Sequence, residues 1–407
     1  MKIRNLAKRN LGPSTCLRSS LLLAAVTTVI SSSIVSASDK SDAKLYGDFL
    51  LRYESVSQDN ALRDADALTL RARIGYATDT VNGFSALIEG EGSVELVDNF
   101  SVPPAGVRPA QFSVIADPES QEIDQAYVKY STNGFSAKLG RQVFTLDGHR
   151  FVGHVGWRQD RQTFDGVVLD YRPDNKFTLT ASYITKRNRI FADKSDIDSK
   201  DTILHSSYKT AFGEVTGYAH LLEVDSGLAN SLDTYGINFS GAKKSGEIKV
   251  LYTAEFAIQE TNKLFDTEYL LIESGAVISG ITAKLGYELL GSDNGRKGFA
   301  TPLATLHKFN GFADQFLVTP NTGLEDIYVS LAGKFAGGKW LATVHKFSSD
   351  ESLNGADDLG NEINLQYTRK LSDKVAGGAK IANYSAGDAI FGKLDTDKFW
   401  LWAGVKF

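Results

Sequence analysis

The sequence predicts an all-β fold, a single transmembrane β-barrel of about 18 antiparallel up-and-down strands, with 16 as the alternative count. Three observations predict it. Apolar and polar residues alternate along many short segments, tight and long connections alternate between those segments, and the N-terminus has the pattern of an export signal. Alternation with a period of two residues is typical of a strand with one apolar and one polar face. A soluble sandwich would turn the apolar faces toward a shared core, whereas a membrane barrel turns them toward lipid.

Residues 1–37 have the pattern of a cleavable secretory signal peptide. Five basic residues and no acidic residue come first, followed by the apolar stretch LLLAAVTTVI and a small-residue cleavage site, Val-Ser-Ala. The apolar stretch is too short for a spanning helix, which needs about 20 apolar residues. Cys16, the only cysteine, would leave with the signal. Loss of the five basic residues would change the formal net charge from −5 to −10, and an acidic exported protein is a poor candidate for binding nucleic acid.

The strands are predicted from segments that each have about the length needed to cross an outer membrane obliquely. In the first of them, LYGDFLLRY, Leu45, Phe49 and Tyr53 fall on one face. The 18 segments are 45–53, 67–77, 84–92, 123–130, 135–144, 164–171, 177–184, 203–209, 214–222, 232–240, 247–258, 268–276, 281–290, 325–335, 339–347, 361–370, 374–383 and 398–407.

The connections predict the orientation of the barrel. Eight are tight, such as STNG and GAKKSG, and they alternate with nine longer ones. Outer-membrane barrels have short periplasmic turns and longer extracellular loops, and an even strand count places both termini on the periplasmic rim. We therefore expect residues 38–407 to form one barrel integral to a bacterial outer membrane, with long extracellular loops at 93–122 and 291–324.

The terminal strand, KFWLWAGVKF, is predicted to close the barrel against the first strand. Its apolar column of Phe399, Leu401, Val405 and Phe407 is expected to face outer-membrane lipid. The final aromatic, Phe407, also resembles the C-terminal signature of bacterial outer-membrane barrels. That resemblance implies recognition by the barrel-assembly machinery.

Charged residues on the opposite columns are candidates for lining the pore. If the second hairpin turns near Val81, Arg73 falls opposite Glu89 and Arg71 falls opposite Glu91. These pairs could either fix the strand register, at about 0.2–1 kcal/mol each, or set a transverse field in the pore. Further inward candidates include Glu54, Lys129, Asp170 and Glu288.

One residue, Arg141, departs from the alternation. It falls in the apolar column of Leu139, where an arginine facing mid-membrane lipid would cost about 2–4 kcal/mol. The sequence leaves two explanations open: Gly140 hosts a β-bulge that turns Arg141 inward, or Arg141 lies beyond the lipid band. We expect the bulge, and with it a pore-lining Arg141.

The segment 145–166, TLDGHRFVGHVGWRQDRQTFDG, is predicted to fold into the lumen. It contains Arg150, Arg158, Arg161 and Trp157, and guanidinium groups suit carboxylates and phosphates. Folded inward, this loop would form a constriction selective for anions or carbohydrate. The alternative is a polar extracellular cap.

Two stretches resemble the outer-membrane porins of the alginate-export family: LGRQVFTLDGHRFVG…W…RQTFDGV and TPLATLHKFNGFADQFLVTPNTGLED. The resemblance implies a passive β-barrel conduit for anionic or carbohydrate solutes, with an anionic polysaccharide such as alginate as the best-known case. The alternative within this class is a general diffusion porin for small hydrophilic solutes. A barrel hydrolase is the rival class, but no nucleophile–base spacing stands out among the six histidines. No cofactor is expected, and no metal site, because the acidic turn SDNG is too short for a calcium loop.

Overall fold

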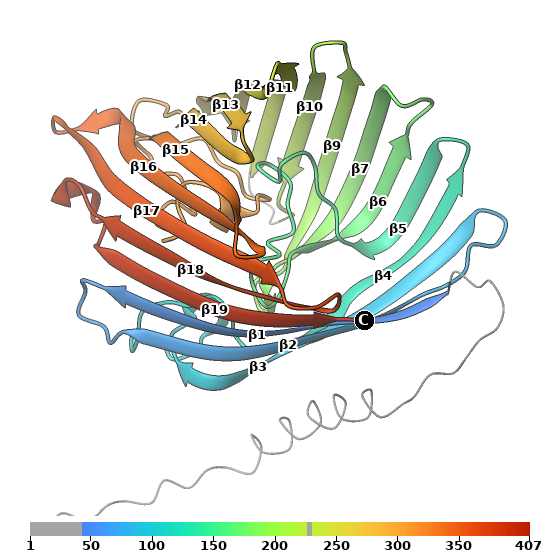
Figure 1. Cartoon of the computed structure of the whole chain (residues 1–407), viewed down its shortest axis with the longest axis horizontal. Coiled ribbons are helices and arrows are strands. Elements are labelled where there is room, and N and C mark those ends of the chain that lie inside the picture. The colour runs from blue at the N-terminus through green and yellow to red at the C-terminus, as the bar shows by residue number, and fades with distance from the viewer. Residues whose placement is uncertain (1–42, 226–229) are drawn as a thin grey trace, which may run out of the picture. The chain divides into compact units, whose positions relative to one another are not determined.

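The computed structural model of the chain describes residues 43–225 and 230–407. The predicted signal peptide, residues 1–37, and Cys16 lie outside the described residues. The strands form one 18-stranded sheet of antiparallel neighbours, and the first and last strands pair with each other, so the sheet closes into a barrel. Figure 1 shows the strands following one another around the ring in chain order, with β19 beside β1.

The strands of the sheet match the 18 predicted segments one for one, so the predicted fold class and strand count are confirmed. A further short strand, β8, lies outside the sheet. The bounds are β1 (Lys44–Gln58), β2 (Ala65–Ala77), β3 (Phe84–Asn99), β4 (Ser120–Thr132), β5 (Phe135–Gln142), β6 (Thr163–Tyr171), β7 (Phe177–Asn188), β8 (Ile190–Asp193), β9 (Ile197–Lys209), β10 (Glu214–Glu223), β11 (Ser231–Ser245), β12 (Ile248–Thr261), β13 (Phe265–Ile278), β14 (Ile281–Leu290), β15 (Leu324–Phe335), β16 (Gly338–Leu353), β17 (Ala356–Lys370), β18 (Val375–Ser385) and β19 (Thr396–Lys406).

Several strands extend beyond their predicted ends, which shortens the loops. The connection predicted at 93–122 is reduced to 100–119, because β3 continues to Asn99 and β4 begins at Ser120. Likewise β6 begins at Thr163, so the segment predicted as loop 145–166 is loop 143–162. The connections at 262–264 and 354–355 are tight turns at the tips of long hairpins rather than long loops. In the extended hairpins the neighbouring strands stay paired, so the ladder satisfies their backbone groups there.

The hairpin between β2 and β3 corrects the predicted charge ladder. Arg73 pairs with Glu91, while Glu89 pairs with Gly75 and Arg71 with Ser93. The turn consists of Asn82 (φ 52°) and Gly83 (φ 86°), both in the left-handed conformation that a two-residue hairpin turn requires. The turn is therefore centred one residue later than Val81, and this displaces every cross-strand pair by two positions.

The two faces of the strands differ as the alternation predicted. On β19, Leu401 is 54% exposed on the outer face, whereas Trp400 is fully buried inside the ring. The carboxyl-terminal residue Phe407 is paired through its backbone with Gly47 of β1, with both N···O distances at 3.1 Å. The outer surface thus presents an apolar band to lipid.

In the part of the chain that the structure describes, no helix has the length and apolar character that a membrane-spanning helix needs.

The expectation of a bulge at Gly140 is wrong. The ladders of β5 with β4 and with β6 keep one register through Gly140, and the shifts lie instead at Asp124 of β4 and Thr185 of β7. Arg141 therefore stays in the outward column of Leu139, which is 66% exposed, and does not line the lumen. Its guanidinium binds Asp165 of β6 through two hydrogen bonds, of 2.8 and 3.2 Å. This carboxylate neutralises the charge close to the end of β5, where the chain leaves the sheet.

Loops fill much of the ring interior, and three clusters of buried apolar side chains hold them against the wall. Loop 100–119 packs Phe100 and Ile115 against β1 and β2. Loop 143–162 and loop 291–323 share a second cluster, in which Val152 and Leu303 contact β6, β7, β9 and β10. In the third cluster, aromatic and aliphatic residues of loop 291–323 pack against wall strands from β10 round to β19. Burying one large apolar side chain stabilises by about 1.5–3 kcal/mol, so the three loops are integral parts of the fold.

Candidate functional site: two loops inside the barrel and the cavity beside them

Loops 143–162 and 291–323 are joined to each other by backbone contacts inside the ring. Val152 and Leu303 form an isolated bridge, and the Gly153 N–H donates to the Leu303 carbonyl at 2.8 Å. A Cβ at Gly153 would lie 2.7 Å from the Thr305 backbone nitrogen, so the close approach of the two loops requires glycine there. The two loops therefore behave as one unit.

Arg158 fixes this unit to β1 and to loop 100–119. Its Nη1 lies 3.0 Å from Glu54 of β1 and 3.4 Å from Asp117, and its Nη2 lies 2.9 Å from Asp314 of loop 291–323. Arg158 is 5% exposed, so these contacts replace its hydration. One guanidinium thus connects a wall strand with three loops.

The charges of this cluster depend on one another. Burial alone would lower the pKa of the Arg158 guanidinium, but Glu54, Asp117 and Asp314 raise it above its ordinary value. Burial alone would raise the pKa of Asp117, but Arg52 and Arg158 lower it below its ordinary value. Arg158 and Asp117 are therefore both ionised at neutral pH, and each of the two charges is stabilised by its partners.

The other charged residues of the loop are paired in the same way. Arg161 binds Glu89 of β3 and Asp124 of β4. Arg73 of β2 binds Glu91 and also donates to the Gln159 carbonyl at 3.2 Å. Contacts between guanidinium groups and carboxylates therefore fasten one side of the loop along β1 to β4.

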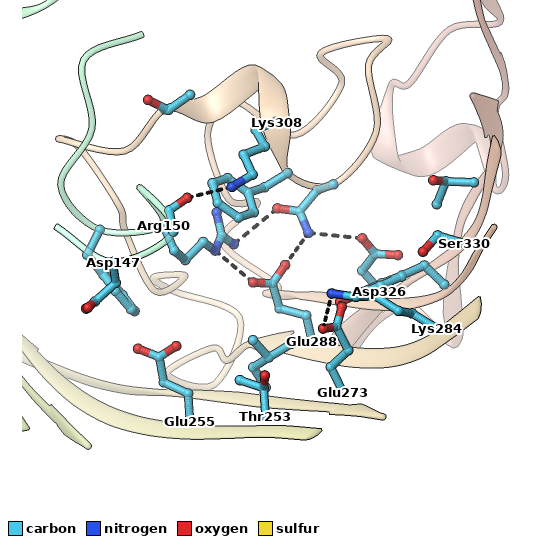
Figure 2. A pocket seen from close by; sticks show the side chains of 18 of the residues that line it. Asp147, Arg150, Thr253, Glu255, Glu273, Lys284, Glu288, Lys308, Asp326 and Ser330 are labelled. Atoms are coloured by element: carbon cyan, nitrogen blue, oxygen red, sulfur yellow. Dashed lines mark hydrogen bonds and ion pairs between the residues drawn. The ribbon is translucent and has the colours of Figure 1, made fainter. Parts of the chain in front are cut away.

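Arg150 fastens the other side of the loop to β14. Its Nε lies 2.7 Å from Glu288, and its Nη2 donates to Asn310 of loop 291–323 at 3.1 Å (Figure 2). Asn310 in turn donates to Glu288 at 2.7 Å and to Asp326 of β15 at 3.2 Å. The two loops therefore cross the lumen from β1 to β15.

Trp157 stacks with an aromatic ring and a lysine ammonium where the two loops cross the lumen. Its ring lies 5.1 Å from that of His307 with an angle of 8° between the planes, and the Lys380 ammonium lies 3.7 Å from the Trp157 ring centroid. His307 also bonds Asp314 at 2.7 Å through Nδ1. Burial lowers the pKa of His307 to about 3, so its ring is neutral at physiological pH.

A cavity of about 880 Å³ lies between the loops and strands β10 to β18. Its lining runs from Glu214 and Thr282, beside the tight turns, to Arg150 and Phe309 on the loops. Figure 2 shows carboxylates of β12, β13 and β14 pointing into the space below Arg150 and Lys308. Four basic side chains and six carboxylates line the cavity, the carboxylates being Asp147, Glu214, Glu255, Glu273, Glu288 and Asp326.

The predicted site residues fall into three groups. Arg73, Glu89, Glu91, Arg150, Trp157, Arg158 and Arg161 meet in or beside the loop that crosses the lumen. Three others face the lumen outside that group: Arg71, which binds Asp48 at 2.8 Å, Lys129, which is directly opposite Lys138, and Asp170, which accepts from Thr180 at 2.7 Å. Arg141 lies on the outer face.

Sequence reasoning missed the partners of the loop arginines. Asp117 and Asp314 were not singled out, and Glu54 and Glu288 were noted only as inward-facing residues. The alternation signals that Glu54 and Glu288 face inward, but no local pattern indicates the carboxylates that lie on loops.

The barrel is closed, its outer face is apolar, and polar, ion-paired loops cross its lumen. These features define an integral outer-membrane channel for passive solute transport. The chain belongs to the alginate export family, whose model matches residues 49–264. Membership and fold both indicate a channel rather than an enzyme.

Solved structures confirm the fold. OccK9 (OpdG) of Pseudomonas aeruginosa superposes with a TM-score of 0.72 at 13% identity, covering 90% of this chain and 98% of that chain. OccAB4 of Acinetobacter baumannii gives a TM-score of 0.70 at 12% identity, covering 91% of this chain and 100% of that chain. OpdK of Pseudomonas aeruginosa, solved with vanillate, gives a TM-score of 0.70 at 13% identity, covering 90% of this chain and 98% of that chain. No curated protein matches the chain in sequence.

Acid should weaken the attachment of the loop to β1. The native pKa of Asp117 lies below the ordinary value of about 3.9, so this carboxylate stabilises the folded state fully above that value and loses its contribution as the pH falls through the lowered native pKa. We expect the single-channel conductance to be constant from about pH 7 to pH 5 and to become larger and noisier below about pH 4. A change that is complete between pH 7 and 5 would assign the effect to a histidine instead.

Proposed function

We propose that the channel conducts small hydrophilic solutes of the carbohydrate class through the space between the crossing loops and strands β10 to β18. The observation that carries this proposal is the lining of the 880 Å³ cavity, which combines aromatic rings with hydrogen-bonding side chains. Trp157, Phe309 and Tyr328 supply apolar faces, and the carboxylates supply acceptors for sugar hydroxyls. The constriction consists of Arg150, Trp157, Arg158 and Arg161 with the neighbouring wall side chains Arg73, Glu89 and Glu91.

In this proposal the loop arginines position the loop and do not select anions. Arg150, Arg158 and Arg161 each contact at least one carboxylate, and their charges are neutralised locally. The cavity lining has more carboxylates than basic side chains. The field in the open part of the lumen therefore opposes anions, and it does so most strongly at low ionic strength.

A second candidate is passage of an anionic polysaccharide such as alginate. One observation favours it besides family membership. Lys129 and Lys138 are directly opposed on β4 and β5, and the Lys138 ammonium lies 5.2 Å from the centroid of the Tyr127 ring. Like charges directly opposite are destabilising in a sheet, so this pair suits an anionic ligand near the tight-turn rim.

Block of single channels by oligosaccharides in a planar bilayer distinguishes the two candidates. We expect a neutral glucose oligomer to interrupt the current and a uronate oligomer of equal length to do so less, because the lining repels it. We also expect a reversal potential in a KCl gradient that indicates no anion preference. Stronger block by the uronate, lost in the variant Lys129→Gln with Lys138→Gln, would replace the carbohydrate proposal by the polysaccharide one.

Assembly is proposed to involve Phe407. Its ring stacks on Phe49 of β1 with centroids 6.0 Å apart, and its side chain is 39% exposed on the lipid face. The exposure of this aromatic side chain supports the proposal that the barrel-assembly machinery recognises the terminal strand. Removal of residues 1–37 as a signal peptide also stays a prediction.

A further inference from the structure

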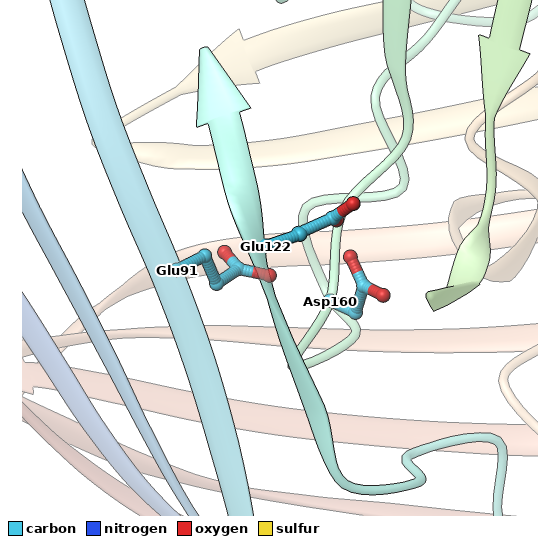
Figure 3. Close-up of side chains that lie close together, drawn as sticks. All are labelled: Glu91, Glu122 and Asp160. Carbon is cyan, nitrogen blue, oxygen red and sulfur yellow. The ribbon is translucent and has the colours of Figure 1, made fainter. Parts of the chain in front are cut away.

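Three carboxylates from separate parts of the chain converge beside the wall at the end of β5. Glu91 comes from β3, Glu122 from β4 and Asp160 from loop 143–162 (Figure 3). One oxygen atom of each lies within 4.8 Å of one oxygen of the other two. The ladder of β4 with β5 begins only at Ala126↔Arg141, so Glu122 lies where β4 extends past the end of β5 and the loop turns inward.

This cluster is largely buried, and Glu91 and Glu122 each have one carboxylate oxygen without a hydrogen bond in the described residues. Glu91 is 4% exposed and Asp160 is 1% exposed. The Glu91 Oε2 binds Arg73, but Oε1 of Glu91 and Oε1 of Glu122 are buried atoms without a hydrogen-bond partner in the described residues. In Figure 3 the Glu91 carboxylate points toward the other two. Buried carboxylate oxygens without a partner are costly, and a native structure compensates them with a proton, a cation or water.

Two guanidinium groups lie beside the cluster, and neither binds the unpartnered oxygens. Arg73 binds Oε2 of Glu91, and Arg141 reaches Oε2 of Glu122 at 3.7 Å, at the limit of an ion pair, while its hydrogen bonds go to Asp165 and to the Ile123 carbonyl. Arg161 is engaged by Glu89 and Asp124. The buried Oε1 atoms of Glu91 and Glu122 are therefore the acceptors that a bound cation would compensate.

We propose that Glu91, Glu122 and Asp160 form a binding site for a hard divalent cation of the calcium class. Calcium takes six to eight oxygen ligands at about 2.3–2.6 Å in flexible geometry, and oxygens up to 4.8 Å apart can share one ion at those distances. Magnesium requires near-ideal octahedral geometry at about 2.0–2.1 Å and suits this arrangement less well. All donors are carboxylate oxygens, which disfavours zinc and copper.

The bound ion would fasten the crossing loop to the wall. Asp160 is next to Arg161 and two residues from Arg158, so the ion would add a link between the loop and strands β3 and β4 at the point where the loop enters the lumen. The site is independent of which solute the channel carries. A sequence motif cannot indicate it, because its ligands come from three segments.

Calcium binding is tested on the full mature barrel, refolded in detergent without lipopolysaccharide, by isothermal titration and equilibrium dialysis with Ca²⁺. We expect one ion per chain, removed by a chelator, with magnesium competing at least about tenfold more weakly. The isosteric double variant Glu122→Gln with Asp160→Asn should lose the ion. The control Asp233→Asn with Asp266→Asn removes the same charge from an acidic hollow elsewhere on the barrel and should keep it.

Proteolysis of the same samples tests whether calcium holds the loop in place. Calcium should slow proteolysis within 143–162 in the wild type and in the control, and should have no effect in the Glu122 and Asp160 variant. Heat-modifiable migration on gels identifies samples that failed to fold. Folded wild-type protein that binds no calcium, or equal binding by the Glu122 and Asp160 variant, would overturn the proposal and indicate that the carboxylates share a proton instead.

Discussion

Replacing Arg158 by Ala should detach the crossing loop from β1 and produce a large change in conductance. The guanidinium is 5% exposed and contacts Glu54, Asp117 and Asp314 at 3.0, 3.4 and 2.9 Å. Removing one partner of a buried pair costs about 3–5 kcal/mol, since it leaves buried charge uncompensated. Arg52 still contacts Asp117 and Lys398 still contacts Asp314, so we expect the lower end of that range.

A cost of about 3 kcal/mol corresponds to a roughly 100-fold increase in the ratio of detached to attached loop. Single-channel recording should therefore show a higher mean conductance with frequent transitions between levels, and trypsin should cleave within 143–162. The matched control is Arg172→Ala in a tight turn, where the side chain is 63% exposed and lies 3.8 Å from Asp170. That exposed pair contributes at most about 1 kcal/mol, and its loss should leave the current unchanged. Identical recordings from both variants would mean that the loop is held by its apolar contacts alone.

The strands could be predicted from the sequence because their signal is local. Alternation within each segment shows which face is apolar, and this gave all 18 strands of the sheet. The register of the second hairpin could also have been predicted from the sequence, because Asn82-Gly83 is a strong signal for a two-residue turn with both residues at positive φ. Placing the turn at Val81 instead displaced the charge ladder by two residues.

The contacts of the crossing loop could not be predicted in this way. Glu54 is 104 positions from Arg158 in the chain, and Asp314 is 156 positions away. No periodic pattern connects residues so far apart, and the residue types alone led to the inference of an anion-attracting cluster. The structure places carboxylates beside those arginines, and these contacts support our proposal that their charges hold the loop in place.

Arg141 shows the opposite error, in which a correct local pattern was set aside. The alternation placed it outward, and the cost of an arginine facing lipid suggested a bulge. That cost applies at the centre of the bilayer, whereas Arg141 is one residue from the end of β5 and is hydrogen-bonded to Asp165. The position of a residue along its strand therefore decides whether the penalty applies.

Replacing Leu401 by Arg should prevent most of the protein from folding into membranes. Leu401 lies at the middle of β19, opposite Tyr53 of β1 and Ala379 of β18, and is 54% exposed on the outer face. An arginine facing lipid near the middle of the bilayer costs about 2–4 kcal/mol, which reduces the folded-to-unfolded ratio by roughly 30- to 1000-fold. The neighbouring variant Trp402→Arg faces the lumen and loses an aromatic contact with Trp157 at 5.2 Å, worth about 0.5–1.5 kcal/mol. Urea titration of both variants in phospholipid vesicles, followed by heat-modifiable migration on gels, measures the two free energies of unfolding. Equal losses at the two positions would contradict the assignment of the lipid face and the lumen face of the strand that closes the barrel.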